Sequence, residues 1–206
     1  TQGRRKAPFF AMGHQNFAAS GGEAFISFSP SSVMRVFVSL SLPSERRQAL
    51  EAFLCRLRDA RALKGRPVRP TNFHLTLAFI GEAEAKRIAQ ALSRLEAVPL
   101  TFAFSQVGTF RSGILWAGLE EKAELGAFAQ RVRTLLEEEG VAYDSRPFRA
   151  HVTLARAWRG SVPVQFRDLH ALNGSGLLPE VQAKAVLMES ARLDDGVGLE
   201  YRPVVP

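Results

Sequence analysis

The sequence predicts an α+β protein with two related halves. Segments with a period of two residues, typical of strands, alternate along the chain with segments whose apolar residues have helical spacing. The run HLTLAF at residues 74–79 is matched by HVTLAR at residues 151–156. Each run follows a predicted helix, so the order of elements repeats. We therefore expect two pseudo-symmetric lobes with one motif each.

The first half opens with a predicted strand and helix. Residues 34–43, MRVFVSLSLP, alternate apolar and polar side chains and end at a proline, which is typical of a strand. Ser44 is expected to cap a helix over residues 44–63, because serine is a preferred N-cap and apolar residues follow at helical spacing. The elements that follow are a loop over 65–73, a strand over 74–81, a helix over 82–98, and strands over 100–110 and 113–120.

The second half repeats this order more loosely. A helix is expected over residues 122–140, with Gly140 at the C-terminal end, where glycine is favoured. The segment RPFRAHVTLAR at residues 146–156 then leads into a strand, as RPTNFHLTLAF does in the first half. The remaining elements are a loop-rich stretch over 159–179 and strands over 181–190 and 198–206, with the turn residues DDG between the strands.

Residues 34–206 form the predicted domain, and residues 1–33 differ from it. The first segment shows no sustained period and is rich in Gly, Ser, Ala and Phe. Its basic start is typical of a signal peptide, but the apolar stretch APFFAMG is short and runs into His14. We interpret this segment as an N-terminal extension or a vector-derived sequence, in which His14 has no role.

Composition indicates a basic globular protein. Hydrophobic residues make up 46% of the chain, enough to bury a core, and no apolar run approaches the roughly 20 residues that span a bilayer. Of the 27 Lys and Arg residues, 22 are arginines, whose planar fork suits phosphate. This bias hints at nucleic acid, although a GC-rich genome would also favour arginine. Cys55, the only cysteine, is expected to be a small buried residue, and a chain without internal disulfides fits the cytoplasm.

The two motifs each place a polar pair on one face of a strand. Side chains alternate between the faces, so each histidine shares its face with the threonine two residues later and then with a small alanine. Large apolar residues occupy the opposite face and are expected in the core. The polar pairs are His74 with Thr76 and His151 with Thr153. Two such pairs are expected by chance in fewer than about 1 in 100 sequences of this composition.

Proton transfer is the chemistry that these pairs favour. A neutral imidazole accepts a proton while a protonated one donates, and hydroxyl donors suit the anionic transition state of a phosphodiester. Zinc prefers three or four ligands, but neither motif contains a carboxylate or cysteine, and His170 as a third ligand has no partner pattern. No nucleophilic-serine motif Gly-x-Ser-x-Gly is present. We therefore expect neither a metal nor a cofactor.

The flanks of both motifs carry a family resemblance. RPTNFHLTLAFIGE and RPFRAHVTLAR resemble the HxTx motifs of the two-histidine (2H) phosphoesterase superfamily, and more closely the bacterial and archaeal RNA 2′,3′-cyclic phosphodiesterases, formerly called 2′-5′ RNA ligases. The resemblance extends over residues 34–206, including RVFVSLSLP and ILWAGLE. It implies a bilobal α+β fold with an antiparallel sheet in each lobe and a groove between the lobes. It also implies hydrolysis of a ribose 2′,3′-cyclic phosphate to a 2′-phosphate without ATP or metal, and a reversible 2′-5′ joining of RNA ends.

The resemblance also implies roles for individual residues. His74 is the expected proton donor to the departing O3′, and His151 the expected acceptor of a proton from water. The chemistry of the residues alone does not order the two histidines, because their strands are near equivalents. Thr76 and Thr153 are expected to donate to the non-bridging phosphate oxygens.

Three further residues are candidates for substrate binding. Arg156 matches a basic position of the family, but regular alternation along its strand would turn it to the leucine face or leave it as a solvated charge. Phe73 and Phe148 precede the motifs, where they either stack on a base or pack in the core.

The expected partner is RNA with a 2′,3′-cyclic phosphate end or a related nucleotide, and the expected state is a cytoplasmic monomer. Two other functions fit the same residues. One is a related esterase that acts on 2′-5′ oligonucleotides or on a cyclic phosphate of ADP-ribose. The other is a nucleotide- or RNA-binding module without catalysis, which the presence of both histidines and both threonines disfavours.

Overall fold

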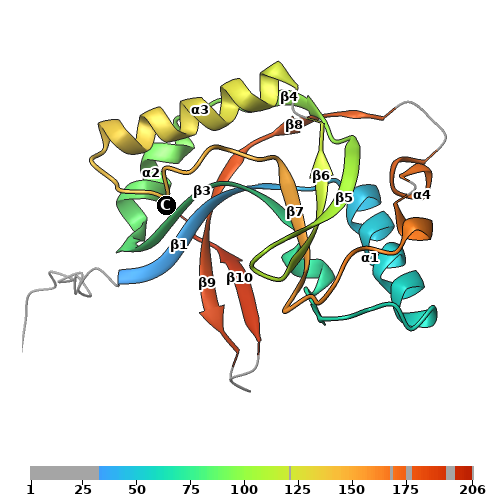
Figure 1. Cartoon of the computed structure of the whole chain (residues 1–206). Helices are drawn as coiled ribbons and strands as arrows, with labels where there is room; N and C mark the ends of the chain where they lie inside the picture. Colours follow the sequence, from blue (N-terminus) through green and yellow to red (C-terminus); the bar gives the residue numbers. More distant parts are fainter. Residues whose placement is uncertain (1–32, 121, 168, 175–177, 194–197, 206) are drawn as a thin grey trace, which may run out of the picture.

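The computed structural model describes residues 33–206 except 121, 168, 175–177, 194–197 and 206 (Figure 1). The N-terminal extension expected over residues 1–33, with His14, therefore lies outside the described residues apart from Val33. In the described part of the chain, no helix has the length and apolar character needed to cross a bilayer.

Strands and helices alternate along the described chain, which confirms the α+β class. The elements in chain order are β1 (Val33–Ser41), α1 (Ser44–Asp59), β2 (Arg66–Pro67), the 3-10 turn η1 (Pro70–Asn72), β3 (His74–Glu84), α2 (Ala85–Ser93), β4 (Val98–Thr101), β5 (Phe104–Phe110), β6 (Ile114–Leu119), α3 (Ala123–Glu138), β7 (His151–Arg156), the 3-10 turn η2 (Val164–Phe166), α4 (His170–Asn173), β8 (Glu180–Ala183), β9 (Ala185–Arg192) and β10 (Leu199–Pro203).

Two half-sheets meet at the two motif strands. The strand order is β10-β9-β1-β3-β7-β6-β5, with β2 also paired to β7, and every pairing is antiparallel. Strands β3 and β7 are joined by one residue pair, Leu75 with Val152. The two predicted halves are therefore continuous through a single contact point, which lies immediately after the histidine of each motif.

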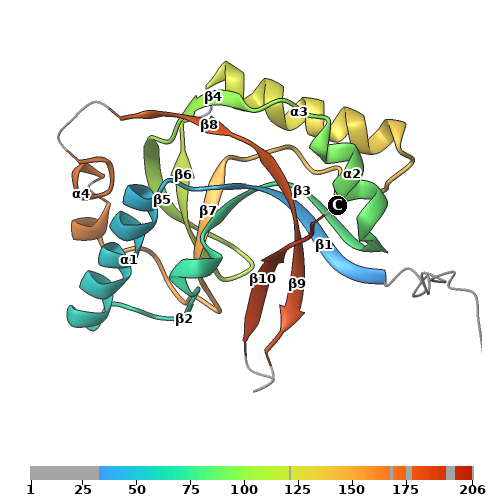
Figure 2. The same cartoon turned by 180° about the vertical axis from the view of Figure 1, so that it is seen from behind.

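The helices are exchanged between the halves. Helix α3, from the second half of the sequence, contacts β3, while α2 contacts β1 and β9. Helix α1, which precedes the first motif, instead contacts α4 from the second half. Figures 1 and 2 show α2 and α3 together at one side of the molecule and α1 with α4 at the other. This exchange ties the halves together where the sheet itself has only one joining pair.

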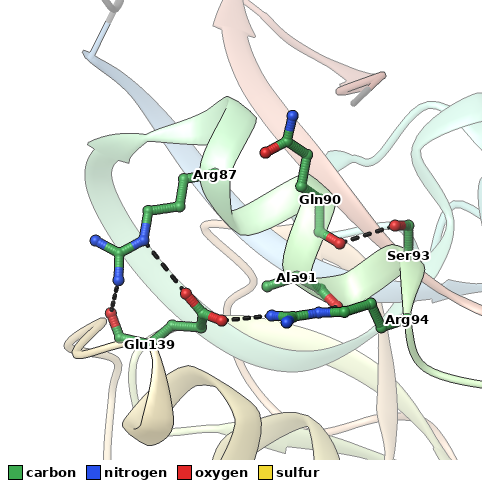
Figure 3. A network of polar contacts seen from close by, with 6 residues as sticks. All are labelled: Arg87, Gln90, Ala91, Ser93, Arg94 and Glu139. Carbon is green, nitrogen blue, oxygen red and sulfur yellow. Dashed lines mark hydrogen bonds and ion pairs between the residues drawn. The ribbon is translucent and has the colours of Figure 1, made fainter.

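Polar contacts hold α2 against the C-terminal end of α3 (Figure 3). The guanidinium of Arg87 lies 3.3 Å from a carboxylate oxygen of Glu139 and donates to its backbone oxygen at 2.9 Å. Arg94 forms a second ion pair with the same carboxylate. Arg87 thus satisfies a backbone oxygen at the C-terminal end of α3, where a helix leaves carbonyl groups without partners.

Alternation along the motif strands builds the core as predicted except at the end of the first motif, where Phe79 is 38% exposed because β3 shifts its register against β1. Leu75 and Leu77 of β3, and Val152 and Leu154 of β7, are at most 1% exposed. The prediction that Cys55 is buried was wrong, because Cys55 lies on the exposed side of α1.

Several details of the elements differ from those predicted. Strand β3 continues to Glu84, so α2 begins at Ala85, because residues 82–84 pair with the first residues of β1. The strand expected over 100–110 is two strands, of which β4 pairs with β8 in a separate two-stranded sheet. Helix α1 begins at Ser44 after Pro43, and no side-chain capping bond is present there.

Candidate active site

The two motif histidines lie at the starts of neighbouring strands. His74 opens β3, His151 opens β7, and the strands pair one residue later. Continuing this antiparallel register by one residue on each side places His74 toward Thr153, and His151 toward Thr76. All four polar side chains are half-buried, while the leucine face is fully buried. The structure thus brings the four predicted residues together at the junction of the two half-sheets.

His74 is held by its backbone and by its own threonine. Its Nδ1–H donates to the backbone oxygen of Asn72 at 2.7 Å, which leaves Nε2 as the atom available for chemistry. Nε2 lies 3.1 Å from the Thr76 hydroxyl, which donates to it when the imidazole is neutral. The rings of Phe37 and Tyr201 pack against the imidazole with centroid distances of 4.8 and 5.0 Å.

His151 has the same arrangement in the other half. Its Nδ1–H donates to the backbone oxygen of Arg149 at 2.8 Å, again two residues before the histidine. Phe110 packs edge-on to the imidazole with a centroid distance of 5.1 Å, and Trp116 lies at 6.5 Å. Each histidine therefore has a fixed tautomer, with Nδ1 tied to a carbonyl and Nε2 free to accept or donate a proton.

Burial keeps both imidazoles neutral at neutral pH. Burial lowers the pKa of His74 from 6.5 to about 4, with smaller lowering contributions from Arg156 and His151 and an opposing one from the Asn72 carbonyl. Burial also lowers the pKa of His151, against the effect of the Arg149 carbonyl. An anionic phosphodiester next to these rings would favour the protonated forms and raise both pKa values.

Arg156 reaches the site because β7 does not alternate regularly. The pairing of β6 with β7 shifts where Leu115 and Trp116 face Ala155 and Thr153, so the strand carries a β-bulge at Leu154. The bulge turns Arg156 toward the groove, where its guanidinium donates to the Tyr201 hydroxyl at 3.4 Å. The bulge therefore keeps Arg156 from the leucine face that regular alternation would give it, and the arginine lies near His74, while its role in substrate binding stays a prediction.

The two phenylalanines before the motifs differ in burial. Phe73 is 3% exposed and lies within the hydrophobic core. Phe148 is partly buried and packs against the same core. Phe73 therefore has no open face for a base, while stacking by the partly exposed Phe148 stays a prediction. The alanines of the motifs, Ala78 and Ala155, are also buried, at 2% and 0% exposure.

Asn72 is a site residue that the sequence analysis missed. It is 7% exposed, and its side chain donates to the Leu199 backbone oxygen at 2.7 Å and accepts from the Tyr201 backbone N–H at 3.2 Å. The same residue accepts the Nδ1–H of His74, so it ties β10 to the first histidine. The only feature of the sequence that points to this role is the position of Asn72 directly before Phe73 and the first histidine.

Other missed residues come from distant segments. Phe37 precedes His74 by 37 residues and Tyr201 follows it by 127, so no local pattern links them to the motif. A cleft of about 370 Å³ opens beside Tyr201 and Arg156. The residues that line it are Arg66, Pro67, Val68, Arg69, Asn72, Arg156, Gly198, Leu199 and Tyr201.

No alternative metal centre is assembled within the described residues. In that part of the chain, no three His, Cys, Asp or Glu residues come together in a way that could hold a metal ion. His170 lies on α4, which packs against α1, and so does not join the two motif histidines.

Comparisons with known proteins agree with this geometry. Residues 40–116 match the family model of LigT-like phosphoesterases. The chain is 33% identical over 165 residues to an RNA 2′,3′-cyclic phosphodiesterase of Aeropyrum pernix, which covers 73% of this chain and 89% of that protein. It is 32% identical over 133 residues to the same enzyme of Archaeoglobus fulgidus, covering 61% of this chain and 74% of the relative. A relative from Geobacillus stearothermophilus, 30% identical over 169 residues, is matched over 52% of its length and 74% of this chain.

Solved structures show the same fold. The crystal structure of Escherichia coli LigT in apo form superposes with a TM-score of 0.66 at 27% identity, covering 84% of this chain and 96% of LigT. The LigT complex with 3′-AMP gives a TM-score of 0.63 at 25% identity, with the same coverage. The chain therefore belongs to the LigT-like family of two-histidine phosphoesterases, together with the RNA 2′,3′-cyclic phosphodiesterases.

Proposed function

We propose that this protein hydrolyses 2′,3′-cyclic phosphodiester ends of RNA to 2′-phosphomonoesters by acid–base catalysis with two histidines. The observation that carries the proposal is the matched pair of imidazoles. Both have Nδ1 bonded to a backbone oxygen, which leaves Nε2 for proton transfer, and both lie beside a threonine at the junction of the half-sheets. The names of the relatives, RNA 2′,3′-cyclic phosphodiesterases, support this substrate class.

The reaction needs one base and one acid on opposite sides of the phosphorus. In the proposed mechanism, His151 Nε2 takes a proton from water, and the water oxygen attacks the phosphorus. The bond from phosphorus to O3′ breaks, and His74 gives its Nε2 proton to that oxygen. Thr76 and Thr153 donate to the non-bridging oxygens, where negative charge accumulates. Each proton transfer contributes about 10² to 10⁴ in rate.

The substrate itself prepares His74 for the donor role. In the protein alone, burial holds the pKa of His74 at about 4, so the imidazole is neutral at neutral pH. The phosphodiester anion supplies the charge that stabilises the imidazolium, while Arg156 balances the excess charge of the transition state. A donor that is protonated only with substrate in place is consistent with this order of events.

The proposal extends to the state of the protein. We infer that residues 34–206 are the phosphoesterase domain and that residues 1–33 are an extension of it. Both histidines belong to one chain, so the site requires no second copy, and we propose a monomer. A cytoplasmic location fits the single cysteine. Joining of RNA ends through a 2′-5′ linkage is the same displacement of O3′ with a 5′-hydroxyl in place of water, and the reverse of that joining cleaves the linkage.

The direct test is incubation with a nucleoside 2′,3′-cyclic phosphate in EDTA, followed by identification of the product isomer. We expect metal-free turnover to the 2′-phosphate, because protonation of O3′ leaves the phosphate on O2′. A 3′-phosphate product would show that O2′ departs, contrary to the proposed leaving group. Loss of activity with EDTA and recovery with zinc or manganese would overturn the two-imidazole mechanism.

A further inference from the structure

Three arginines gather in the cleft beside the histidines. Arg66 of β2 is the direct cross-strand partner of Arg156 of β7, and Arg69 follows on the same loop. The guanidinium of Arg69 lies near Gly198, 3.9 Å from where a side chain there would begin. The cleft therefore joins β2, β7 and the start of β10 next to the catalytic centre.

The three arginines of the cleft form a positively charged group that suits an anionic ligand. Like charges directly opposite each other across two strands are destabilising. Among the described residues, the carboxylates that form ion pairs do so with other arginines, and none pairs with Arg66, Arg69 or Arg156. Asn72 and Tyr201, the polar residues of the same cleft, bring no negative charge. The cost of holding Arg66 opposite Arg156 is offset when phosphate groups lie beside the two guanidinium groups.

The chemistry of the substrate identifies which phosphate this is. A 2′,3′-cyclic phosphate is the end of an RNA chain, so further phosphates lie only on the 5′ side of the terminal nucleotide. We propose that Arg66 and Arg69 bind the phosphodiester that precedes the terminal nucleotide, while the cyclic phosphate occupies the site between the histidines. The enzyme then prefers oligonucleotide ends to mononucleotides. This subsite rests on the proposed function, because it takes the reacting phosphate as its reference point.

The test compares three substrates that share the same reacting group. They are a nucleoside 2′,3′-cyclic phosphate, a dinucleotide with the same cyclic end, and that dinucleotide with an uncharged methylphosphonate linkage. We expect the wild-type protein to prefer the charged dinucleotide by about tenfold in kcat/KM over the other two substrates, since only the charged linkage engages the arginines. The double variant Arg66→Gln with Arg69→Gln should lose this preference and process all three substrates with similar kcat/KM. Arg47→Gln, an exposed arginine at the start of α1, is the matched control and should keep the preference.

The outcomes separate the subsite from the proposed function. An equal loss of kcat/KM on all three substrates in the double variant would show that the two arginines act on the reacting phosphate or stabilise the fold. Either result would overturn the subsite. A charged-dinucleotide preference that survives in the double variant would do the same. Should the wild-type protein turn over none of the substrates, the proposed function fails, and calorimetry with the charged and methylphosphonate 2′-phosphate dinucleotides still tests the subsite. Equal affinity of the wild-type protein for those two ligands would then overturn it.

Discussion

The imidazole of His74 is buried where its charged form is costly, and this links stability to pH. Its pKa is about 4 in the folded protein and 6.5 in the unfolded chain, so between these values the unfolded chain binds more protons. The free energy of unfolding should therefore fall as the pH drops from 7 toward 4, with roughly 2 kcal/mol lost through His74 by about pH 5. Above about pH 7.5 the imidazole is neutral in both states and the contribution is constant.

His74→Gln should remove this part of the acid sensitivity. Urea unfolding at about pH 7.5 and pH 5 measures it directly for the wild-type protein and the variant. The wild-type protein should lose more stability between the two pH values than the variant does. Identical losses in the two proteins would show that His74 titrates normally and is not held neutral by burial.

Asn72 acts on catalysis through His74 and should be separable from a purely structural asparagine. Asn173 is a matched control, because its side chain also makes two backbone bonds, both to Phe104 at 2.8 Å, without bonding a histidine. Replacement of either asparagine by Ala should destabilise the fold by about 1–3 kcal/mol, since buried backbone groups lose partners. Only Asn72→Ala should also lower kcat and move the pH profile of kcat/KM. If both variants keep the wild-type profile, Asn72 has no positioning role.

The limits of sequence reasoning at this scale follow from local geometry. His74, Thr76, His151 and Thr153 could be predicted because regular alternation fixes their common face. The face of Arg156 could not, because a bulge has no clear pattern in a single sequence. Asn72 is defined by two bonds to β10, a strand that begins 127 residues later, and such pairings are invisible before folding.

At the scale of elements, two glycines leave space for the indole of Trp116, which lies beside His151. The indole of Trp116 lies across β5 and β6, and a side chain on Gly108 would begin 2.5 Å from its Cζ2 atom. A side chain on Gly118 would begin 2.9 Å from Cζ3 of the same ring. These close approaches explain why glycines occur inside two strands, where they otherwise weaken the ladder.

Gly108→Ala should displace Trp116, whose indole lies beside the imidazole of His151. We expect a loss of about 1–3 kcal/mol in stability, as for other overpacked sites, together with reduced turnover. Gly126→Ala is the control, because it lies inside α3 with nothing near the added methyl and should stabilise by up to about 1 kcal/mol. Thermal unfolding and kcat for the two variants test this account. Unchanged values for Gly108→Ala would show that the indole does not set the position of His151.

Element boundaries were predictable where local signals are strong. Gly140 ends α3 with a positive φ, and its N–H and that of Val141 bond back to Glu137 and Leu136, as expected for a glycine-terminated helix. The extension of β3 through residues 82–84 was not predictable, since it depends on pairing with β1. A helix-compatible sequence there is overridden by tertiary contacts.

At the scale of the whole molecule, the active site exists only where the two halves meet. Each half contributes one histidine and one threonine, and the sheet joins them through the single pair Leu75 and Val152. The exchange of α1 and α3 between halves fixes this junction in a way that the repeated motifs did not reveal. The repeat in the sequence predicted two related units, but the packing that unites them depends on contacts far apart in the chain.

The central claim is that the two histidines act as acid and base on one phosphodiester. The measurement that tests it is the turnover of His74→Ala and His151→Ala on a cyclic phosphate and on an activated aryl phosphodiester, whose leaving group needs no proton. Each variant should lose about 10² to 10⁴ on the cyclic phosphate. On the aryl substrate, His74→Ala should recover much of its rate and His151→Ala should not. Recovery of His151→Ala alone would reverse the two roles, and near-normal turnover of both variants on both substrates would contradict the claim that these histidines form the catalytic centre.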